Sequence, residues 1–280
     1  MHNSHLTIDF HCELGFHTAI AEAVQRLLSG HDDWVSIKKN DRNTIAYHPE
    51  LGVYFKSFYR NSVTERLKSI FSGGRAHRTL KGTRLLQAAN CLAPDILATG
   101  RYSNNDFIIM EALNGPPLLN TLESYLKDKP DSQWRNDLFR ELGFTIGKMH
   151  AQGVIHGDLR GNNVVIVPDH DCYRLAMIDN ERTRKAFRFK REQRRNLKQI
   201  MLFGPHYITS SERDMFFDCY FQAFPHSSSR AKLLVKCTFD EVEEHFQRKG
   251  IVQGTPLEPI DYWPTIRSLQ PLEVSQHNIG

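Results

Sequence analysis

Hydrophobic and polar residues alternate in three short segments near the start of the chain. These are residues 34–37, 44–47 and 53–58, and polar turns separate them. Alternation with a period of two, bounded by turn residues, predicts β-strands, and successive strands joined by short turns pair antiparallel. The pattern therefore predicts a small antiparallel sheet. Lys56 lies on the third strand and shares a face with Tyr54 and Phe58, opposite Val53 and Phe55.

A helical spacing of apolar residues replaces this alternation elsewhere. It predicts a helix within residues 12–28 that Gly30 closes, and a strongly amphipathic helix over 134–150 that Gly153 ends. Two further strands are predicted, at 96–99 and 107–110. The remaining predicted helices lie at 75–90, 191–203, 212–224 and 239–249. In the second of these six helices along the chain, the apolar residues expected to face the sheet are Leu80, Leu85, Leu86 and Ala89.

The character of the chain changes at residues 111–117, which contain Gly115, Pro116 and Pro117. Such a composition is typical of a connector. It divides the chain into an N-terminal helical extension (1–32), a lobe with a sheet and one helix (33–113) and a mainly helical lobe (114–280). The expected class is α+β with two lobes.

Residues 154–166 form the segment richest in chemistry, because a short polar loop there runs into an apolar strand. The loop contains Asp158, Arg160 and Asn163, and a second apolar strand at 175–180 places Asp179 near its end. Phosphoryl transfer needs a carboxylate that orients the attacking hydroxyl and oxygen ligands that hold magnesium on the phosphates. The pattern His-x-Asp-x-x-x-x-Asn followed by a strand-end Asp is specific, because several residue types agree at fixed spacing.

The order of the predicted elements and this polar motif together resemble those of the protein-kinase-like fold. The resemblance implies that Lys56 grips the phosphates of ATP, that Asp158 accepts the proton of the substrate hydroxyl, and that Asn163 and Asp179 bind Mg²⁺. It places Arg160 at the transferred phosphate and gives His156 a structural role through backbone hydrogen bonds. In the connector, backbone groups of Glu111 and Leu113 are expected to meet adenine.

A narrower resemblance is to the bacterial lipopolysaccharide core kinases, which phosphorylate Kdo or heptose. It covers residues 34–224 and implies an anionic glycolipid as acceptor. The segments that carry it are Ala76-His77-Arg78-Thr79-Leu80, Leu92-Ala93-Pro94, Asp179-Asn180-Glu181-Arg182-Thr183, Arg194-Arg195-Asn196-Leu197 and Ser211-Glu212-Arg213.

The chain departs from the general kinase pattern in three places. The expected nucleotide loop, residues 39–43, has no glycine. The helix 75–90 has no glutamate to pair with Lys56, and Thr79 occupies the nearest matching position. Glu181 stands where kinases have a glycine, so it is expected either to add a carboxylate near the metal or to face solvent.

Composition sets outer limits on the class of protein. Hydrophobic residues make up 40% and charged residues 24% of 280, which is typical of a globular protein, and a net charge of +4 does not itself imply nucleic-acid binding. The five cysteines are scattered and form no Cys-x-x-Cys pair, which fits a reducing compartment. The sequence shows no signal peptide and no apolar run that would span a membrane, so a cytoplasmic location is expected.

Residues 182–198 are strongly basic. The charges form either a solvated helix face or a patch that attracts an anionic acceptor or the inner leaflet of the membrane. Phe187 and Phe189 lie among them and could touch lipid or sugar. RNA binding is the weaker interpretation, because no RNA-binding motif accompanies the charges, and no nucleic-acid partner is expected.

Two alternatives stay open for the activity. The chain could phosphorylate another small molecule or a protein hydroxyl, or it could be a pseudokinase that binds nucleotide without chemistry. The missing helix glutamate favours a pseudokinase, and the intact set of Asp158, Asn163 and Asp179 favours a kinase. Lys56 could also be an ordinary solvated strand lysine.

Overall fold

The computed structural model describes residues 6–59, 73–128, 132–170, 172–203 and 208–249. The chain forms two compact units, and each is considered by itself. The first unit contains residues 1–84, 93–114 and 179–183. The second unit contains residues 85–92, 115–178 and 184–280. The final, proline-containing residues 256–280 lie outside the described residues.

An antiparallel sheet of six strands forms the first unit, in the order β1-β5-β6-β4-β3-β2. The β4 strand lies inside it and pairs with β3 and β6, so the sequence prediction of a small antiparallel sheet is confirmed. The strands are β1 (Leu6–Phe10), β2 (Val35–Lys39), β3 (Asn43–His48), β4 (Val53–Phe58), β5 (Ile96–Tyr102) and β6 (Asn105–Glu111).

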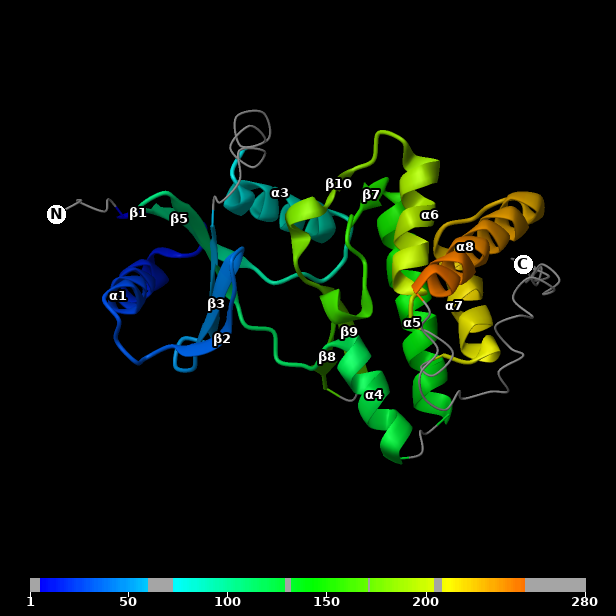
Figure 1. The fold of residues 1–280 in the computed structure, drawn as a ribbon, viewed down its shortest axis with the longest axis horizontal. Coiled ribbons are helices and arrows are strands. Elements are labelled where there is room, and N and C mark those ends of the chain that lie inside the picture. The colour runs from blue at the N-terminus through cyan, green and yellow to red at the C-terminus, as the bar shows by residue number, and fades with distance from the viewer. Residues whose placement is uncertain (1–5, 60–72, 129–131, 171, 204–207, 250–280) are drawn as a thin grey trace. The chain divides into compact units, whose positions relative to one another are not determined.

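A helix covers each face of this sheet (Figure 1). Helix α1 (His17–Leu28) packs on the face that carries Phe55, and α3 (Arg75–Ala88) packs on the face that carries Phe58. Successive side chains of β4 thus point to opposite faces of the sheet and belong to two separate hydrophobic cores, as the sequence predicted. Lys56 shares the α3 face.

The prediction for α3 was partly wrong. Leu80 packs against the sheet together with Ala76. Leu86 and Ala89 are buried too, but they belong to the second unit. The spacing of apolar residues along one helix does not mark where the partner of that helix changes.

The strand β1 was not predicted, because only a helix was expected in residues 1–32. It extends the sheet by pairing antiparallel with β5, with Leu6 opposite Tyr102. Leu6, Ile8 and Phe10 pack against the core on the α1 face. The period-two signal in this segment covers only three apolar positions, which is too few to distinguish a strand from irregular chain.

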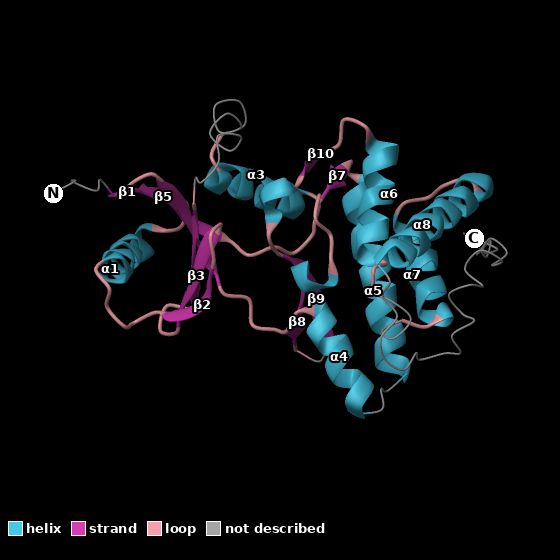
Figure 2. Ribbon diagram, viewed as in Figure 1, coloured by secondary structure: helices cyan, strands magenta, loops and turns pink. Residues whose placement is uncertain are grey.

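The second unit is mainly helical and contains two short antiparallel pairs of strands (Figure 2). Helix α4 was not predicted, and α8 begins well before the predicted residue 239. None of the helices in the described part of the chain is long and apolar enough to cross a bilayer. The elements are α4 (Leu118–Asp128), α5 (Ser132–Ala151), β7 (Val154–Ile155), β8 (Val164–Asp169), β9 (Cys172–Met177), β10 (Arg184–Lys185), α6 (Phe189–Ile200), α7 (Ser210–Ala223) and α8 (Ser228–Lys249).

Helices α5 and α7 make the closest helix pair in this unit. A Cβ atom at Gly143 would lie 2.0 Å from the Phe216 carbonyl oxygen, so only glycine permits the two backbones to approach this closely. A buried ion pair between Arg135 and Glu212 joins the same helices, and Thr209 caps α7 in a capping box with Glu212. This pair fixes the framework on which α6 and the polar loop rest.

Candidate active site

Asp158 lies in the loop that follows β7. Its Oδ1 forms an ion pair with Arg160 Nε at 3.1 Å and accepts a hydrogen bond from Gln199 Nε2 at 3.5 Å. The Asp158 side chain is 26% exposed and that of Arg160 is 64% exposed, so both remain open to a reactant. A carboxylate held from two sides but still accessible is the arrangement a base needs to accept a hydroxyl proton.

His156 holds this loop from within, as the sequence predicted. The side chain is fully buried. Its Nε2 donates to the Ile178 carbonyl oxygen at 3.0 Å, and its Nδ1 accepts from the Asp158 backbone N–H at 3.4 Å. Both ring nitrogens are therefore occupied by the backbone, and the expected bracing role is confirmed.

Helix α6 supplies a second set of braces that sequence reasoning missed. Asn196 Oδ1 accepts from the His156 backbone N–H at 3.0 Å, and Gln199 Oε1 accepts from the Leu159 N–H at 3.2 Å. Asn196 is fully buried, and Gln199 nearly so. The sequence contained a signal for these braces, because Asn196 and Gln199 lie three positions apart on the otherwise apolar side of an amphipathic helix. A buried side-chain amide in such a position needs a hydrogen-bond partner.

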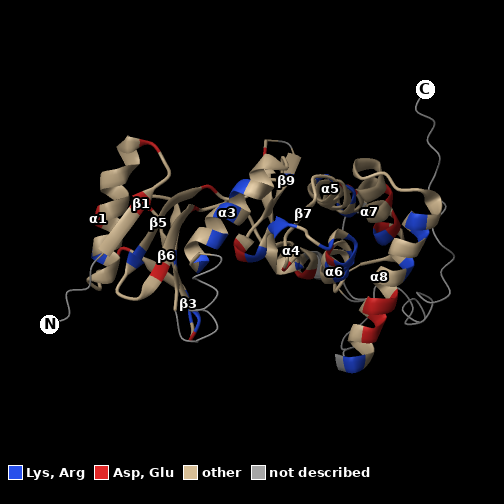
Figure 3. Ribbon diagram, turned by 90° about the horizontal axis from the view of Figure 1, so that it is seen from above, with Lys and Arg blue, Asp and Glu red and all other residues tan. Residues whose placement is uncertain are grey.

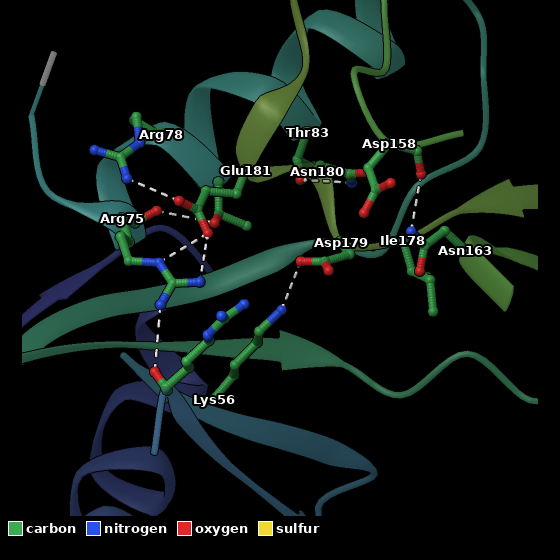
Figure 4. A network of polar contacts seen from close by, with 12 residues as sticks. Lys56, Arg75, Arg78, Thr83, Asp158, Asn163, Ile178, Asp179, Asn180 and Glu181 are labelled. Atoms are coloured by element: carbon green, nitrogen blue, oxygen red, sulfur yellow. Dashed lines mark hydrogen bonds and ion pairs between the residues drawn. The ribbon is translucent and has the colours of Figure 1, made fainter. Parts of the chain in front are cut away.

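Asn163 ties the loop to the strand-end segment, as drawn in Figure 4. Its Nδ2 donates to the Asp158 carbonyl oxygen at 2.9 Å, and its own carbonyl oxygen accepts from the Ile178 N–H at 3.0 Å. Ile178 is thus bonded at its N–H by Asn163 and at its carbonyl by His156. Asp179 follows directly in the chain, so the residue before the candidate metal ligand is fixed to the loop.

Lys56 and Asp179 form an ion pair in the first unit (Figure 4). Lys56 Nζ lies 2.7 Å from Asp179 Oδ1, and the two side chains are 9% and 44% exposed. Asp179 adopts a left-handed conformation with φ 60° and ψ 49°, which aspartate tolerates better than most residues. The lysine that lacks a helix glutamate has this aspartate as its anionic partner, and it is not a solvated strand lysine.

Glu181 neither faces solvent nor points to a metal. Its Oε2 is 2.8 Å from Arg75 Nη2 and its Oε1 is 2.7 Å from Arg78 Nη2, and all three side chains are at most one-fifth exposed. The close-up in Figure 4 shows the carboxylate held between both guanidinium groups. We call this triad the α3 clamp. It joins α3 to residues 179–183. The charges are the reverse of those in the general kinase pattern, because here the helix supplies the cations and not a glutamate.

The clamp predicts a stability effect for Glu181→Gln. The substitution keeps the volume but removes the anion between two largely buried guanidinium groups, so we expect it to lower the free energy of unfolding by about 2–3 kcal/mol. Urea unfolding followed by circular dichroism measures the change. Glu22→Gln on the exposed side of α1 is the matched control and should change stability by less than about 0.5 kcal/mol. Equal effects of the two variants would contradict the clamp.

Close packing supports the clamp at the next turn of α3. A Cβ at Gly82 would lie 2.0 Å from the Asn180 carbonyl oxygen, and Asn180 Nδ2 donates to Thr83 Oγ1 at 3.0 Å. Asn180 is 1% exposed. Thr79, the residue nearest to the missing glutamate, instead donates its hydroxyl to the Arg75 carbonyl within the helix.

The loop between β2 and β3 closes on itself. Asn40 Oδ1 accepts from the backbone N–H groups of Arg42 and Asn43 at 2.9 and 3.0 Å. In a glycine-rich loop such N–H groups would be available to phosphates, but here the asparagine side chain occupies them. The absence of glycine therefore has a structural counterpart, because these N–H groups already have a side-chain acceptor.

The connector after β6 offers backbone groups at one position. Glu111 donates its N–H to the Asp95 carbonyl at 2.9 Å, and Ala112 donates its N–H to the Gly52 carbonyl at 2.8 Å. Within the described residues, the backbone N–H and carbonyl of Leu113 make no hydrogen bond. A purine edge needs such a free donor and acceptor pair.

The donor set fits magnesium. Asn163 uses its amide nitrogen toward Asp158, which leaves its side-chain oxygen for a cation, and Asp179 adds a carboxylate. Mg²⁺ is usually held by one or two protein oxygens together with substrate phosphates and water. The described residues contain no group of three or more His, Cys, Asp or Glu side chains that could hold a metal ion.

His150 connects the braces to the core of the second unit. Its Nδ1 lies 2.9 Å from the Tyr220 hydroxyl and its Nε2 lies 3.4 Å from Asn196 Oδ1. Complete burial lowers the pKa of His150 to about 4, against the opposing effect of the Asn196 hydrogen bond. The ring is therefore neutral in the folded protein near neutral pH.

This burial predicts a pH-dependent loss of stability. The unfolded chain binds a proton at His150 below its ordinary pKa of 6.5, and the folded chain does so only near 4. Stability is therefore lost as the pH falls through this window, by about 2 kcal/mol between pH 7.5 and 5. We expect His150→Gln to flatten that part of the profile in urea unfolding. An unchanged slope in the variant would show that His150 does not titrate this way.

Known proteins are similar to this chain in structure or in sequence. A solved structure described as WaaP in complex with acyl carrier protein matches 85% of this chain and 98% of its own, with a TM-score of 0.59 and 17% identity. Bud32 subunits of the KEOPS complex are similar over a third of this chain: 34% identity over 92 residues in Encephalitozoon cuniculi and 31% over 93 residues in Pyrococcus abyssi. The chain spans about two-fifths of the length of these relatives.

The fold is similar to that of WaaP, and the family match makes the chain a phosphotransferase, as the sequence predicted. The family model described as lipopolysaccharide kinase (Kdo/WaaP) matches residues 26–220. The chain belongs to this family, and the narrower resemblance drawn from its motifs is confirmed.

Proposed function

We propose that the protein transfers the γ-phosphate of ATP to a hydroxyl of a lipopolysaccharide core sugar, either Kdo or heptose. The observation that carries the proposal is the braced Asp158, because its carboxylate is oriented by Arg160 and Gln199 and stays accessible. Membership of the Kdo/WaaP family supports the class of acceptor. The reaction forms a phosphate ester on the sugar and releases ADP.

Each polar side chain then has a distinct role. Asp158 accepts the proton of the acceptor hydroxyl, and Arg160 offsets charge on the transferred phosphoryl group. Lys56 holds the nucleotide phosphates as a point charge. Asn163 and Asp179 would hold Mg²⁺, which neutralises charge on the phosphates when bound. The backbones of Glu111 and Leu113 receive adenine, with Leu113 offering the free donor.

The acceptor class suggests where the protein works. A glycolipid acceptor is anchored in a membrane, so we propose a cytoplasmic protein that contacts the inner leaflet through residues 182–198. Phe187 is 94% exposed within this run, and an aromatic ring flanked by cations suits a lipid–water boundary. The WaaP structure contains acyl carrier protein, so an acidic carrier protein is also a candidate partner.

Phosphate transfer to purified core oligosaccharide tests the proposal. Dephosphorylated lipopolysaccharide core, labelled ATP and Mg²⁺ are incubated with wild-type protein and with Asp158→Asn, and label on the sugar is measured by mass spectrometry. Label that depends on Asp158 supports the proposal. Core phosphate that is unchanged in a deletion strain of the source organism, together with no transfer in vitro, would remove this acceptor.

A second candidate is a kinase that acts on a protein hydroxyl or another small molecule, since subunits of a protein complex, the Bud32 proteins, are similar to a third of this chain. The same label would then appear on protein or on a metabolite, not on core sugar. A nucleotide-binding pseudokinase would show stabilisation by ATP and Mg²⁺ and no transfer to any acceptor.

A further inference from the structure

A basic hollow lies on the second unit beside α6. It has a volume of about 450 Å³, and its wall contains Arg and Lys side chains with two carboxylates. Figure 3 shows the basic residues along α6 and the acidic residues of α8. We call this hollow the α6 pocket. Its lining residues are Arg184, Arg188, Arg191, Glu192, Arg194, Arg195, Lys198 and Glu241.

The carboxylates of the pocket leave part of its positive charge uncompensated. Glu192 pairs with Arg184 at 3.1 Å, and Glu241 lies 4.0 Å from Arg194 and 3.9 Å from Lys198. Three other cations of the wall make no ion pair or side-chain hydrogen bond within the described residues. These are Arg188, Arg191 and Arg195.

Two of the free arginines lie on one side of α6, because Arg191 and Arg195 are four residues apart in the helix. Arg188 directly precedes the helix and lines the same hollow. Like charges three or four residues apart cost about 0.2–0.5 kcal/mol per pair, and cations near a helix N-terminus oppose its dipole. An anion placed among them would reverse both penalties.

We propose that the α6 pocket binds a ligand that carries two or more phosphate groups. Arginine matches phosphate geometry with paired N–H donors, and several arginines around one hollow select multiply charged phosphate over a single carboxylate. The volume is in the range of small-ligand sites. It therefore favours a phosphorylated headgroup or a soluble polyphosphate over the broad, flat surface of a protein partner.

Pyrophosphate without Mg²⁺ is the probe, and isothermal titration calorimetry is the measurement. We expect Arg191→Gln with Arg195→Gln to weaken binding at least tenfold, since each lost bond to a charged group is worth about 1.5–3 kcal/mol. Lys190→Gln is the matched control, because this exposed lysine is on the same helix but outside the pocket wall. It should change affinity less than twofold.

Two comparisons distinguish the α6 pocket from a diffuse basic surface and from the nucleotide site. Lys56→Met removes any pyrophosphate bound at the candidate nucleotide lysine, so the arginine substitutions should weaken binding by the same factor in the Lys56→Met background, because the pocket does not involve that lysine. If Lys190→Gln lost as much pyrophosphate affinity as the variant with Arg191→Gln and Arg195→Gln, the binding would be due to a diffuse basic surface. This result would overturn the proposal. Loss only in Lys56→Met would assign the probe to the nucleotide site and also overturn it. Circular dichroism establishes that each variant is folded.

The source of the phosphate is distinguished by vesicles of phosphatidylcholine with and without phosphatidic acid. Vesicle binding that needs phosphatidic acid and is lost in the arginine variant supports the pocket and assigns it to a lipid headgroup. Loss of pyrophosphate binding alone supports the pocket and assigns it to a soluble ligand. Binding of purified acyl carrier protein that needs both arginines, with no pyrophosphate binding, would overturn the proposal. Since only binding is measured, the result does not depend on the proposed phosphotransfer.

Discussion

Asp158→Asn is expected to lower kcat about 10²- to 10⁴-fold, the usual contribution of a positioned general base. The amide keeps the shape of the side chain but no longer accepts the proton of the attacking hydroxyl. Stability should change by less than about 1 kcal/mol, because the Asp158 partner Arg160 is 64% exposed and such ion pairs contribute little. Steady-state phosphotransfer and urea unfolding measure the two effects separately.

The control is Asp169→Asn at the end of β8, in the same unit. This carboxylate makes no hydrogen bond or ion pair within the described residues, so both rate and stability should remain at wild-type values. An Asp158→Asn protein that turns over at the wild-type rate would remove Asp158 from the mechanism. The same rate loss in both variants would point to a general effect of charge.

Asp179→Asn is expected to abolish the stabilisation that ATP and Mg²⁺ give to the wild-type protein, and to lower kcat by about 10²–10³. It should also lower the free energy of unfolding by about 1–3 kcal/mol, because Lys56 is 9% exposed and would lose the anion 2.7 Å away. Thermal unfolding with and without nucleotide measures the two effects on stability, and steady-state phosphotransfer measures kcat.

Lys56→Met separates the two roles of this ion pair. It removes the nearly buried ammonium, so the ligand-free protein should keep its stability while nucleotide affinity falls. Asp179→Asn and Lys56→Met should thus both lose the stabilisation by ATP and Mg²⁺. They should differ in the stability of the ligand-free protein, which only Asp179→Asn lowers. If both kept the full thermal shift with ATP and Mg²⁺, neither residue would contact nucleotide.

Sequence reasoning succeeded where chemistry is encoded at short, fixed spacing. Asp158, Arg160 and Asn163 fall within six residues, and Asp179 ends the next strand pair, so one local pattern identified the polar loop. The sheet was predictable for the same reason, since β4 alternates between two buried faces.

The α3 clamp could not be predicted, because it joins residues far apart in the sequence. Arg75 and Glu181 are separated by 106 positions, and no periodicity links a helix to a turn at that distance. The two candidate environments for Glu181, metal and solvent, were both wrong, because an acid with buried cationic partners leaves no local signature. Helix α4 was missed because Pro116 and Pro117 directly precede it and mark the segment as a connector.

The reversed charges of the α3 clamp have a consequence for control of the enzyme. Many protein kinases switch off by swinging this helix outward, which breaks its glutamate away from the strand lysine. Here the lysine does not depend on the helix, and two arginines fasten that helix to Glu181, two residues after the candidate metal ligand. An outward movement of this helix would therefore break the two ion pairs of Glu181 and would not remove the anionic partner of Lys56.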